Sequence, residues 1–435
     1  MKIIHTADLH LGQILYQSYE RSDEHAHFFQ QLESWCKQHQ PDALVVSGDV
    51  FDIQQPSAST RKAFTDYFVR LHLQCPAMHI VITAGNHDSA SRIQADNAVW
   101  TLANTHLIGV SPSIDLLDGP DGWQDNYIIR LENGFIVALP YMSGDRQRQI
   151  QSILDRVATQ NTQHLPVVLM AHLAVTGSDA TGHDFEIGKI KTVDLKSLGI
   201  GYDYLALGHI HKPQTLNHPE DNFTDTVTYP SPAARYSGSA LHVSCDETYP
   251  HSVSLVEINQ AGGNVNIQQL HIDELRHFHV LPLDGTSFLS DMDALQAIRD
   301  LADQGEECYF RLRIDRHTFL PDNFNQQIYD LLAQCHNRLR YNPKHLWTGE
   351  GDDDAQHQKL VFEVAELQQM TDPMVFIEKT RDQYPDLDIE EVRDAFEEIK
   401  EEIHRHDEEE KAALIAKEAE KAARKANKTN QKQQS

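Results

Sequence analysis

The chain has 435 residues, of which 40% are hydrophobic, and it carries a formal net charge of −28. This length is typical of two or three domains with sizeable cores, and no apolar run approaches the ~18 residues of a membrane span. The acidic balance argues against a protein that holds nucleic acid by bulk electrostatic attraction alone.

The N-terminus leads directly into a strand-like run, Ile3-Ile4, and lacks the anatomy of a signal peptide. The five cysteines are scattered and form no C-x-x-C pair of the kind that binds zinc or performs redox chemistry. Both features are typical of a protein that works in the reducing cytoplasm. We therefore predict a soluble, cytoplasmic protein.

In chain order, short apolar runs alternate with helical patterns through the first half of the sequence. Buried strands are predicted at residues 3–4, 43–46, 80–82, 106–110, 128–129, 135–141, 167–170 and 204–207. Helices are predicted at residues 25–38, 57–74, 89–102 and 145–159. The β-α-β beginning predicts parallel strands joined by right-handed crossovers.

A polar cluster directly follows five of these predicted strands. The polar residues are Asp8, His10, Asp49, Asp52, Asn86, His87, Asp88, His172, His209 and His211. Such residues lie where the chain leaves the sheet, and the glycines among them allow tight turns. If the strands are neighbours, we expect these side chains to converge on one rim of the sheet.

Seven of these residues offer oxygen and nitrogen donors, enough for two divalent cations that share one carboxylate. The seven are Asp8, His10, Asp49, Asn86, His172, His209 and His211, with Asp49 as the natural bridge. Two such cations clamp a phosphate and hold a hydroxide for in-line attack. In the alternative interpretation, each fragment is an ordinary loop, because Asp, Asn and Gly all favour turns.

The order D-x-H, G-D-x-x-D, G-N-H-D, a lone histidine and G-H-x-H resembles the calcineurin-like metallophosphoesterase superfamily. Within it, residues 4–12, 48–52 and 206–214 resemble the bacterial SbcD nuclease family, whose members are the exonuclease subunits of SbcCD complexes. The resemblance covers residues 1–275 by motif and the remainder by order of elements only.

This resemblance implies an α+β, four-layer fold, in which residues 1–275 form a β-sandwich flanked by helices. A hairpin of residues 253–258 and 265–272 closes that domain. Residues 276–348 then correspond to a small α+β capping domain, with strands at 279–283, 309–314 and 339–341 and helices at 292–301 and 324–335. Residues 349–387 are a linker, and residues 388–435 are a C-terminal helical, partner-binding segment with a basic tail.

The resemblance also implies residue roles. One cation would be held by Asp8, His10, Asp49 and His211, and the other by Asp49, Asn86, His172 and His209. This mixed donor set suits Mn²⁺ better than Mg²⁺, which prefers oxygen. His87 would be a general acid or charge stabiliser, and Asp52 and Asp88 are candidates for orienting neighbouring groups or for capping turns.

The implied function is a two-metal DNA nuclease of repair and recombination, acting with an SbcC-type coiled-coil ATPase and as a homodimer within a larger complex. Its activities would be 3′ to 5′ exonuclease on duplexes and endonuclease on single strands. The alternatives are a phosphomonoesterase or cyclic-nucleotide phosphodiesterase of the same fold, and a non-catalytic scaffold.

Residues 388–405 carry an apolar stripe at helical spacing, made by Ile389, Val392, Phe396, Ile399 and Ile403. Little folded chain remains to cover it, which predicts docking on a partner such as the base of the ATPase coiled coil. The alternative is docking back on the capping domain.

Overall fold

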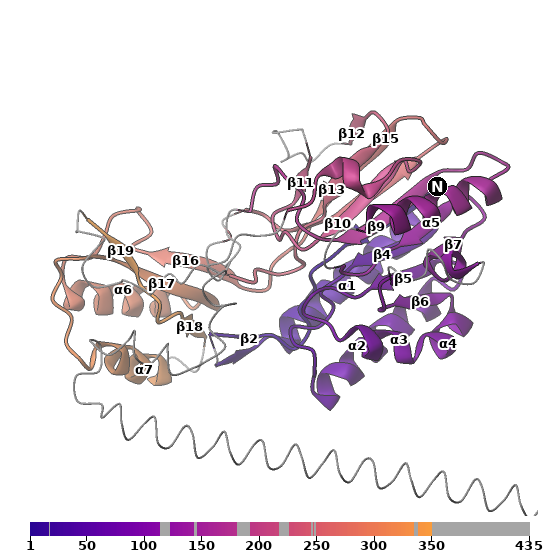
Figure 1. Ribbon diagram of the computed structural model, residues 1–435. Helices are drawn as coiled ribbons and strands as arrows, with labels where there is room; N and C mark the ends of the chain where they lie inside the picture. The colour runs from indigo at the N-terminus through magenta and orange to yellow at the C-terminus, as the bar shows by residue number, and fades with distance from the viewer. Residues whose placement is uncertain are drawn as a thin grey trace, which may run out of the picture. The chain divides into compact units, whose positions relative to one another are not determined.

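A computed structural model describes residues 1–16, 18–113, 122–142, 146–180, 192–216, 226–244, 247, 249–334 and 338–349. Two sheets pack face to face in the first part of the chain (Figure 1). The seven-stranded sheet has the order β12-β15-β14-β1-β4-β5-β6. Its strands are β1 (Lys2–Thr6), β4 (Ala43–Ser47), β5 (His79–Thr83), β6 (Thr105–Ile108), β12 (Val227–Tyr229), β14 (Ser252–Ile258) and β15 (Val265–His271).

The six-stranded sheet has the order β11-β13-β10-β9-β8-β7. Its strands are β7 (Ile128–Arg130), β8 (Phe135–Ala138), β9 (Val167–His172), β10 (Tyr204–Gly208), β11 (Gln214–Thr215) and β13 (Ala233–Tyr236). In each sheet the central strands pair in parallel: β1, β4, β5 and β6 in one, and β8, β9, β10 and β13 in the other. The carboxyl ends of the parallel strands within each sheet therefore meet at one edge.

Alternation along the strands divides the core into layers. Ile3 and Val45 belong to the apolar cluster between the two sheets, whereas their neighbours Ile4 and Val46 face the helix side, as the two-residue period of a strand requires. Helices α1 (Ser22–His39) and α2 (Ala58–Gln74) contribute to the outer cluster, and α5 (Gln147–Gln160) covers the second sheet. The predicted four-layer arrangement is confirmed.

The expected β-α-β beginning and the hairpin are confirmed, since β1 and β4 pair in parallel and β14 and β15 pair antiparallel. The helix predicted at residues 89–102 is wrong as a continuous element. It breaks into α3 (Ala90–Ala95), α4 (Asn97–Trp100) and the 3-10 turn η1 (Thr101–Ala103). The break falls at Asp96, whose ψ is 6°, and the side chain of Asn97 accepts a hydrogen bond from Leu107 N at 2.8 Å. That bond pairs a backbone N–H of β6 with the Asn97 side chain, next to the residue where the helix breaks.

Other boundaries shift for local reasons. The strand predicted at 135–141 ends at Ala138, shortly before Pro140, which has no N–H to donate to a ladder. Six short strands were not predicted: β2 (Ile14–Leu15), β3 (Tyr19–Glu20), β11, β12, β13 and β19 (Leu346–Thr348). The 3-10 turns η3 (Trp123–Tyr127) and η4 (Leu195–Leu198) complete the connections of the second sheet.

A third sheet follows the sandwich and has its own apolar core. Strands β16 (His277–Leu281), β17 (Cys308–Asp315), β18 (Leu339–Tyr341) and β19 all pair in parallel around β17. Helices α6 (Asp291–Asp303) and α7 (Phe324–Gln334) connect the strands and bury Ile298 and Ile328 against them. The strand predicted at 279–283 starts and ends two residues earlier, because Pro282 ends the ladder.

A buried carboxylate, Glu24 on α1, is the meeting point of side chains from this third sheet. Its Oε1 accepts hydrogen bonds from Tyr309 Oη at 2.6 Å, from Arg276 at 3.1 Å and from Arg340 at 3.1 Å. A buried charge needs such partners to offset its desolvation. This cluster is therefore the polar link between α1 and β17.

No helix in the ranges described above is both long enough and apolar enough to cross a membrane. The predicted linker after Gly349, the apolar stripe of residues 388–405 and the basic tail lie outside the described residues. They stay predictions from sequence.

We expect Phe68→Ala to destabilise the protein by about 3–5 kcal/mol, the usual cost of removing a buried phenyl ring. Phe68 on α2 is fully buried and packs edge-on against Phe29 of α1. Val69→Ala on the same helix is the matched control, because Val69 is 40% exposed and should cost little. Urea unfolding of both variants measures the difference, and equal losses would contradict this account of the core.

Candidate metal centre

Four of the polar residues that follow strands have left-handed backbone conformations. The φ angles are 51° at Asp8, 45° at His10, 45° at Asp49 and 97° at His209. Residues other than glycine rarely adopt this region, and they do so where the surrounding structure holds them there. The three loops that follow β1, β4 and β10 therefore hold side chains in directions that an ordinary strand end would not supply.

Backbone hydrogen bonds continue the pairing of β1 with β4 beyond the sheet. Asp8 N donates to Gly48 O at 3.1 Å, and His10 N donates to Asp49 O at 3.0 Å. A further bond joins Leu11 N to Val50 O at 2.9 Å. The two loops run side by side as a result, and they bring the carboxylates of Asp8 and Asp49 into one buried region.

Glycine is required at two motif positions because neighbouring side chains come very close to the backbone there. A Cβ on Gly48 would lie 2.1 Å from His172 Nδ1, and a Cβ on Gly85 would lie 2.0 Å from Asp49 Oδ1. No side chain can occupy either position without displacing a residue of the centre. The glycines of G-D-x-x-D and G-N-H-D thus make room for neighbouring donors as well as for turns.

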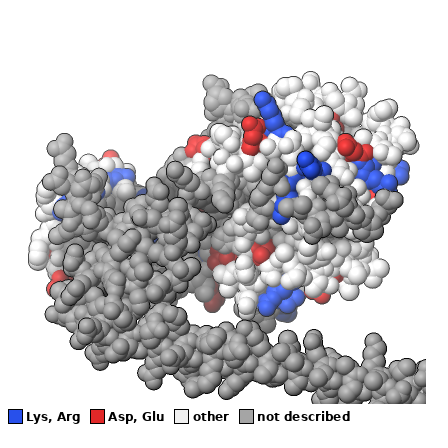
Figure 2. Space-filling view, in the orientation of Figure 1, with Lys and Arg blue, Asp and Glu red and all other residues white. Residues whose placement is uncertain are grey.

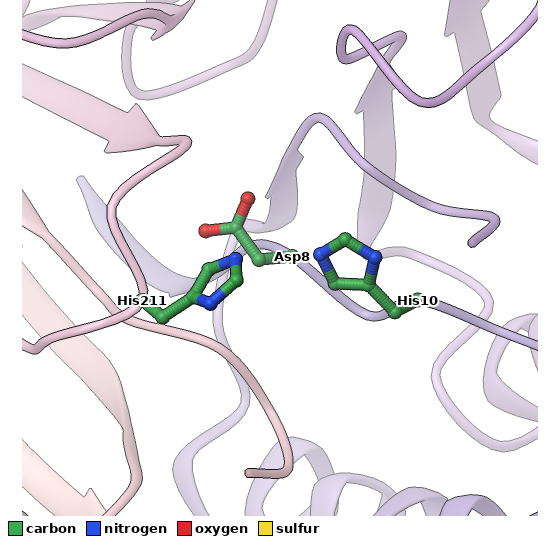
Figure 3. Close-up of side chains that lie close together, drawn as sticks. All are labelled: Asp8, His10 and His211. Atoms are coloured by element: carbon green, nitrogen blue, oxygen red, sulfur yellow. The ribbon is translucent and has the colours of Figure 1, made fainter. Parts of the chain in front are cut away.

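A first group of donors is formed by Asp8, His10 and His211, whose nearest ligand atoms all lie within 4.8 Å of one another. Figure 3 shows these three side chains close together: Asp8 and His10 come from the loop after β1, and His211 comes from the loop after β10. Both ring nitrogens of His10 are buried and make no hydrogen bond within the described part of the chain. His211 Nδ1 lies 2.9 Å from Glu247 Oε1, so the other ring nitrogen, Nε2, points away from Glu247.

A second group is formed by Asp49, His172 and His209, again within 4.8 Å. His172 Nδ1 donates to Ser47 O at 2.8 Å, so its Nε2 faces Asp49 Oδ2 at 3.2 Å. The amide oxygen of Asn86 lies 3.0 Å from His172 Nε2 and 2.9 Å from His209 Nδ1. Seven donors from five loops therefore gather at the carboxyl ends of strands from both sheets.

Asp49 reaches both groups. Besides its contact with His172, its Oδ2 lies 4.0 Å from His10 Nε2 in the first group. Its other oxygen, Oδ1, accepts a hydrogen bond from His87 N at 2.9 Å. Asp49 is thus the carboxylate positioned between the two sets of donors.

His87 is exposed, unlike its neighbours in the centre. Its Nδ1 lies 2.8 Å from Asp52 O, so the ring is oriented by a carbonyl and keeps Nε2 for another contact. His10, Asp52 and His87 form a further group with donor atoms within 4.8 Å, and Asp52 Oδ1 lies 3.3 Å from His10 Nδ1. His87 therefore stands at the solvent side of the centre, beside His10.

Asp88 is buried and faces backbone rather than the donor groups. Its carboxylate accepts hydrogen bonds from Val50 N at 3.0 Å, Phe51 N at 2.9 Å and Gly85 N at 2.8 Å. The first two bonds join the loop after β4 to the loop after β5. Asp88 thereby holds Asp49 and Asn86 in register with each other.

The electrostatics of the centre show the cost of this burial. Burial raises the pKa of Asp8 to about 7, and the nearby charge of Asp49 adds to the shift. Burial also acts to raise the pKa of Asp49, but protonated His172 outweighs it and holds that pKa below its usual range. Burial lowers the pKa of His172, whereas Asp49 and Asp8 raise it, to about 9.

These pKa directions describe a site that requires positive charge. A proton on His172 and the raised pKa of Asp8 both reduce the negative charge of the buried carboxylates. Imidazole nitrogens, carboxylates and an amide oxygen, with the buried His10 nitrogens free of hydrogen bonds in the described structure, fit a divalent cation of the first transition row. The residues present therefore fit a divalent metal.

Glu247 was not predicted from the sequence as part of the site. It is 2% exposed, and it contacts His211 through Oε1 and Val243 N through Oε2, the latter at 3.1 Å. It belongs to no motif and does not follow a predicted strand. Only the fold places it behind His211, so no local signal in the sequence could have identified it.

We predict that divalent metal binding releases protons and weakens as the pH falls. Ligands must be deprotonated, and the pKa of His172 is about 9 and that of Asp8 about 7. Affinity should therefore be highest above pH 9 and should decrease as the pH falls through 9 and then 7. Titration calorimetry of Mn²⁺ binding in buffers of different ionisation enthalpy measures the released protons. Binding without proton release at pH 7 would contradict this charge arrangement.

We also predict that Glu247→Ala lowers affinity for the metal at the centre by about 10- to 100-fold, the typical effect of losing a carboxylate behind a ligating histidine. Glu247→Gln should lose less, because its amide oxygen still accepts from His211 Nδ1. Calorimetric titration gives both affinities. Equal affinities for wild type and the alanine variant would remove Glu247 from this role.

Comparisons with known proteins agree with the geometry. The model of the calcineurin-like phosphoesterase family matches residues 1–213. The SbcD subunit of the nuclease SbcCD in Rhodobacter capsulatus is 29% identical over 352 residues, which cover 73% of this chain and 81% of that one. The SbcD subunits of Escherichia coli K12 and Bacillus subtilis 168 are 28% and 29% identical, over 67% and 59% of this chain and 74% and 66% of theirs. This chain is thus similar to calcineurin-like phosphoesterases over residues 1–213 and, over a larger part of its length, to the SbcD subunits of bacterial SbcCD nucleases.

Proposed function

We propose that this chain is a metal-dependent nuclease of the SbcCD type that hydrolyses phosphodiester bonds in DNA. One observation carries the proposal. Seven nitrogen and oxygen donors lie in two adjoining groups, and Asp49 lies close to donors of both groups. Such an arrangement fits two cations with a shared carboxylate, which bind a phosphate and activate water for in-line attack. The similarity to proteins named as nuclease subunits supports DNA as the substrate.

In this proposal, Asp8, His10, Asp49 and His211 hold one divalent ion, and Asp49, Asn86, His172 and His209 hold the other. Mn²⁺ is the ion we expect, because the set mixes imidazoles with harder oxygen ligands. Calcineurin-like phosphoesterases use divalent metals, and the donor set suits that chemistry.

His87 is the proposed acid. Its Nδ1 is held by the carbonyl of Asp52, and its exposed ring borders the donor groups, which supports a role beside a phosphodiester bound there. An imidazole in this position donates a proton to the leaving group, or stabilises its charge, while the donors behind it hold the metal. Asp52 is therefore a positioning residue for both His87 and His10.

The proposal includes 3′ to 5′ exonuclease activity on duplexes, endonuclease activity on single strands, and roles in DNA repair and recombination in the cytoplasm. Residues 276–348 act in it as a cap that narrows access to the centre.

A phosphomonoesterase, a cyclic-nucleotide phosphodiesterase and a scaffold without activity are the alternatives. Incubation with Mn²⁺ and end-labelled duplex, circular single-stranded DNA or p-nitrophenyl phosphate separates them: cleavage of the nitrophenyl ester alone would favour the phosphatase.

DNA affinity is expected to depend on a partner. On the face seen in Figure 2, blue and red side chains are interspersed over the described residues and form no extended basic stripe. With a net charge of −28, the chain alone would attract a polyanion weakly. We infer that an SbcC-type coiled-coil ATPase supplies the remaining affinity. Co-purification of a tagged chain with such an ATPase tests the partnership.

The homodimer is likewise part of the proposal. Apolar side chains are exposed on three helical segments: Leu73 on α2 at 72%, Val99 on α4 at 70% and Leu102 on η1 at 88%. Exposed apolar side chains of this kind would be covered by a second copy of the chain. A monomeric mass in solution at micromolar concentration would contradict this contact.

We predict that Asp49→Ala abolishes hydrolysis and lowers the metal content, because the loss of a shared carboxylate loosens both ions. Metal analysis and a Mn²⁺-dependent nuclease assay check the prediction on one preparation. Full activity with undiminished metal content would refute the shared carboxylate.

We predict that His87→Ala leaves the metal content and the melting temperature unchanged while the rate falls by about 10²- to 10⁴-fold, the range for general acid catalysis. DNA binding should persist, because phosphate and metal contacts are spared. His317→Ala is the matched control, since His317 is an exposed histidine on the loop after β17 and should retain full activity. If His87→Ala lost metal in parallel with rate, His87 would be a ligand rather than the acid.

A further inference from the structure

A second cluster of histidine and glutamate lies on the far side of Glu247 from the metal centre. It consists of His242, His251 and Glu274, and one ligand atom of each lies within 4.8 Å of the others. His251 is 1% exposed and His242 is 8% exposed. None of the three belongs to the motifs that follow the strands, and none has a role in the hydrolysis proposed above.

His251 carries the argument because one of its nitrogens is buried without a hydrogen-bond partner. Its Nδ1 donates to the carbonyl of Ser239 at 2.9 Å, which fixes the tautomer and leaves a lone pair at Nε2. Within the described residues Nε2 makes no hydrogen bond, and the nearest charged atom is Glu247 Oε2 at 3.3 Å. Burial lowers the pKa of His251 to about 3, so the ring is neutral. A lone pair thus faces a carboxylate oxygen in a buried place, an arrangement that a cation bound at Nε2 would stabilise.

Packing holds the other two donors in place. The ring of His242 lies between the ring of His251, at a centroid distance of 4.2 Å, and the ring of Phe278, at 4.6 Å and nearly parallel. His242 Nδ1 lies 3.1 Å from Glu274 Oε1. Glu274 is the outermost of the three, with 18% of its side chain exposed, and it gives the cluster a route to solvent.

We propose that His242, His251 and Glu274 form a third cation site, separate from the two groups around Asp49. Two imidazoles and one carboxylate are a frequent ligand set for Zn²⁺, and they leave a position open for water or a further ligand. A hard ion such as Mg²⁺ would be disfavoured, since most of the donors are nitrogen.

Glu247 joins this site to the metal centre. One of its oxygens lies 2.9 Å from His211 Nδ1, and the other lies 3.3 Å from His251 Nε2. A cation bound by His251 would draw electron density from the same carboxylate that orients His211. A cation at the third site therefore acts on His211 through Glu247. Filling the third site should change the affinity of the main centre for its metal by a measurable factor.

The test uses the full chain and Zn²⁺ as the probe. After equilibration and removal of free metal, wild type should retain about one equivalent of zinc more than His251→Gln, as expected for a single three-ligand site. His279→Gln is the matched control, because His279 pairs with Glu306, which lies just before β17, and is outside the cluster. Equal zinc contents in wild type and His251→Gln would overturn the proposal, and so would an equal loss in the control.

Two further measurements keep the result decisive if His251→Gln does not fold. Glu274→Gln changes a half-buried residue and should also lose the extra equivalent. Anomalous scattering at the zinc edge from wild-type crystals should place a peak among the three side chains, and its absence there would refute the site. Asp49→Ala, which disables the main centre, should keep this peak, so a failure of the nuclease proposal leaves the test intact.

Discussion

The burial of two carboxylates, Asp8 and Asp49, at the edge shared by the two sheets is the constraint on which the rest of the structure depends. Charges removed from water are costly unless they are compensated by opposite charge and hydrogen bonds. Here His172 approaches Asp49 at 3.2 Å, and Asp8 accepts two hydrogen bonds from the backbone N–H of His209, at 2.9 and 3.1 Å. The same buried carboxylates, with the histidines beside them, are donors that fit a divalent cation at this edge.

Precision at the centre comes from the sandwich beneath it. The donors stand on loops of strained backbone, but each loop lies close to a buried strand, and backbone hydrogen bonds tie the loops after β1 and β4 together. Asp88 adds two more bonds between loops, and Gly48 and Gly85 allow the loops to approach. Sites carried on rigid elements keep their geometry better than sites on free loops, which suits a centre whose donors must keep fixed positions.

Buried carboxylates outside the centre are compensated in the same way, by hydrogen bonds and opposite charges. Glu247 supports His211 and also meets His251, while Glu24 gathers Arg276, Tyr309 and Arg340. Each buried acid has several partners, so the loss of any one leaves others unpaired.

The sequence by itself determined the longer strands, most helices and the motif residues, because apolar periodicity and the glycine-flanked polar clusters are local signals. It was wrong at residues 89–102, where the side chain of Asn97 bonds to β6 and the helix breaks into shorter pieces. It was silent on short strands such as β19, which have too few residues to show a period. That the donors lie in two groups, that Asp49 reaches both, and that Glu247 stands behind His211 was decided by the tertiary structure alone. Contacts such as Glu247 with His211 join residues 36 positions apart in the chain. They arise from the pairing and packing of strands, and neither composition nor spacing records them.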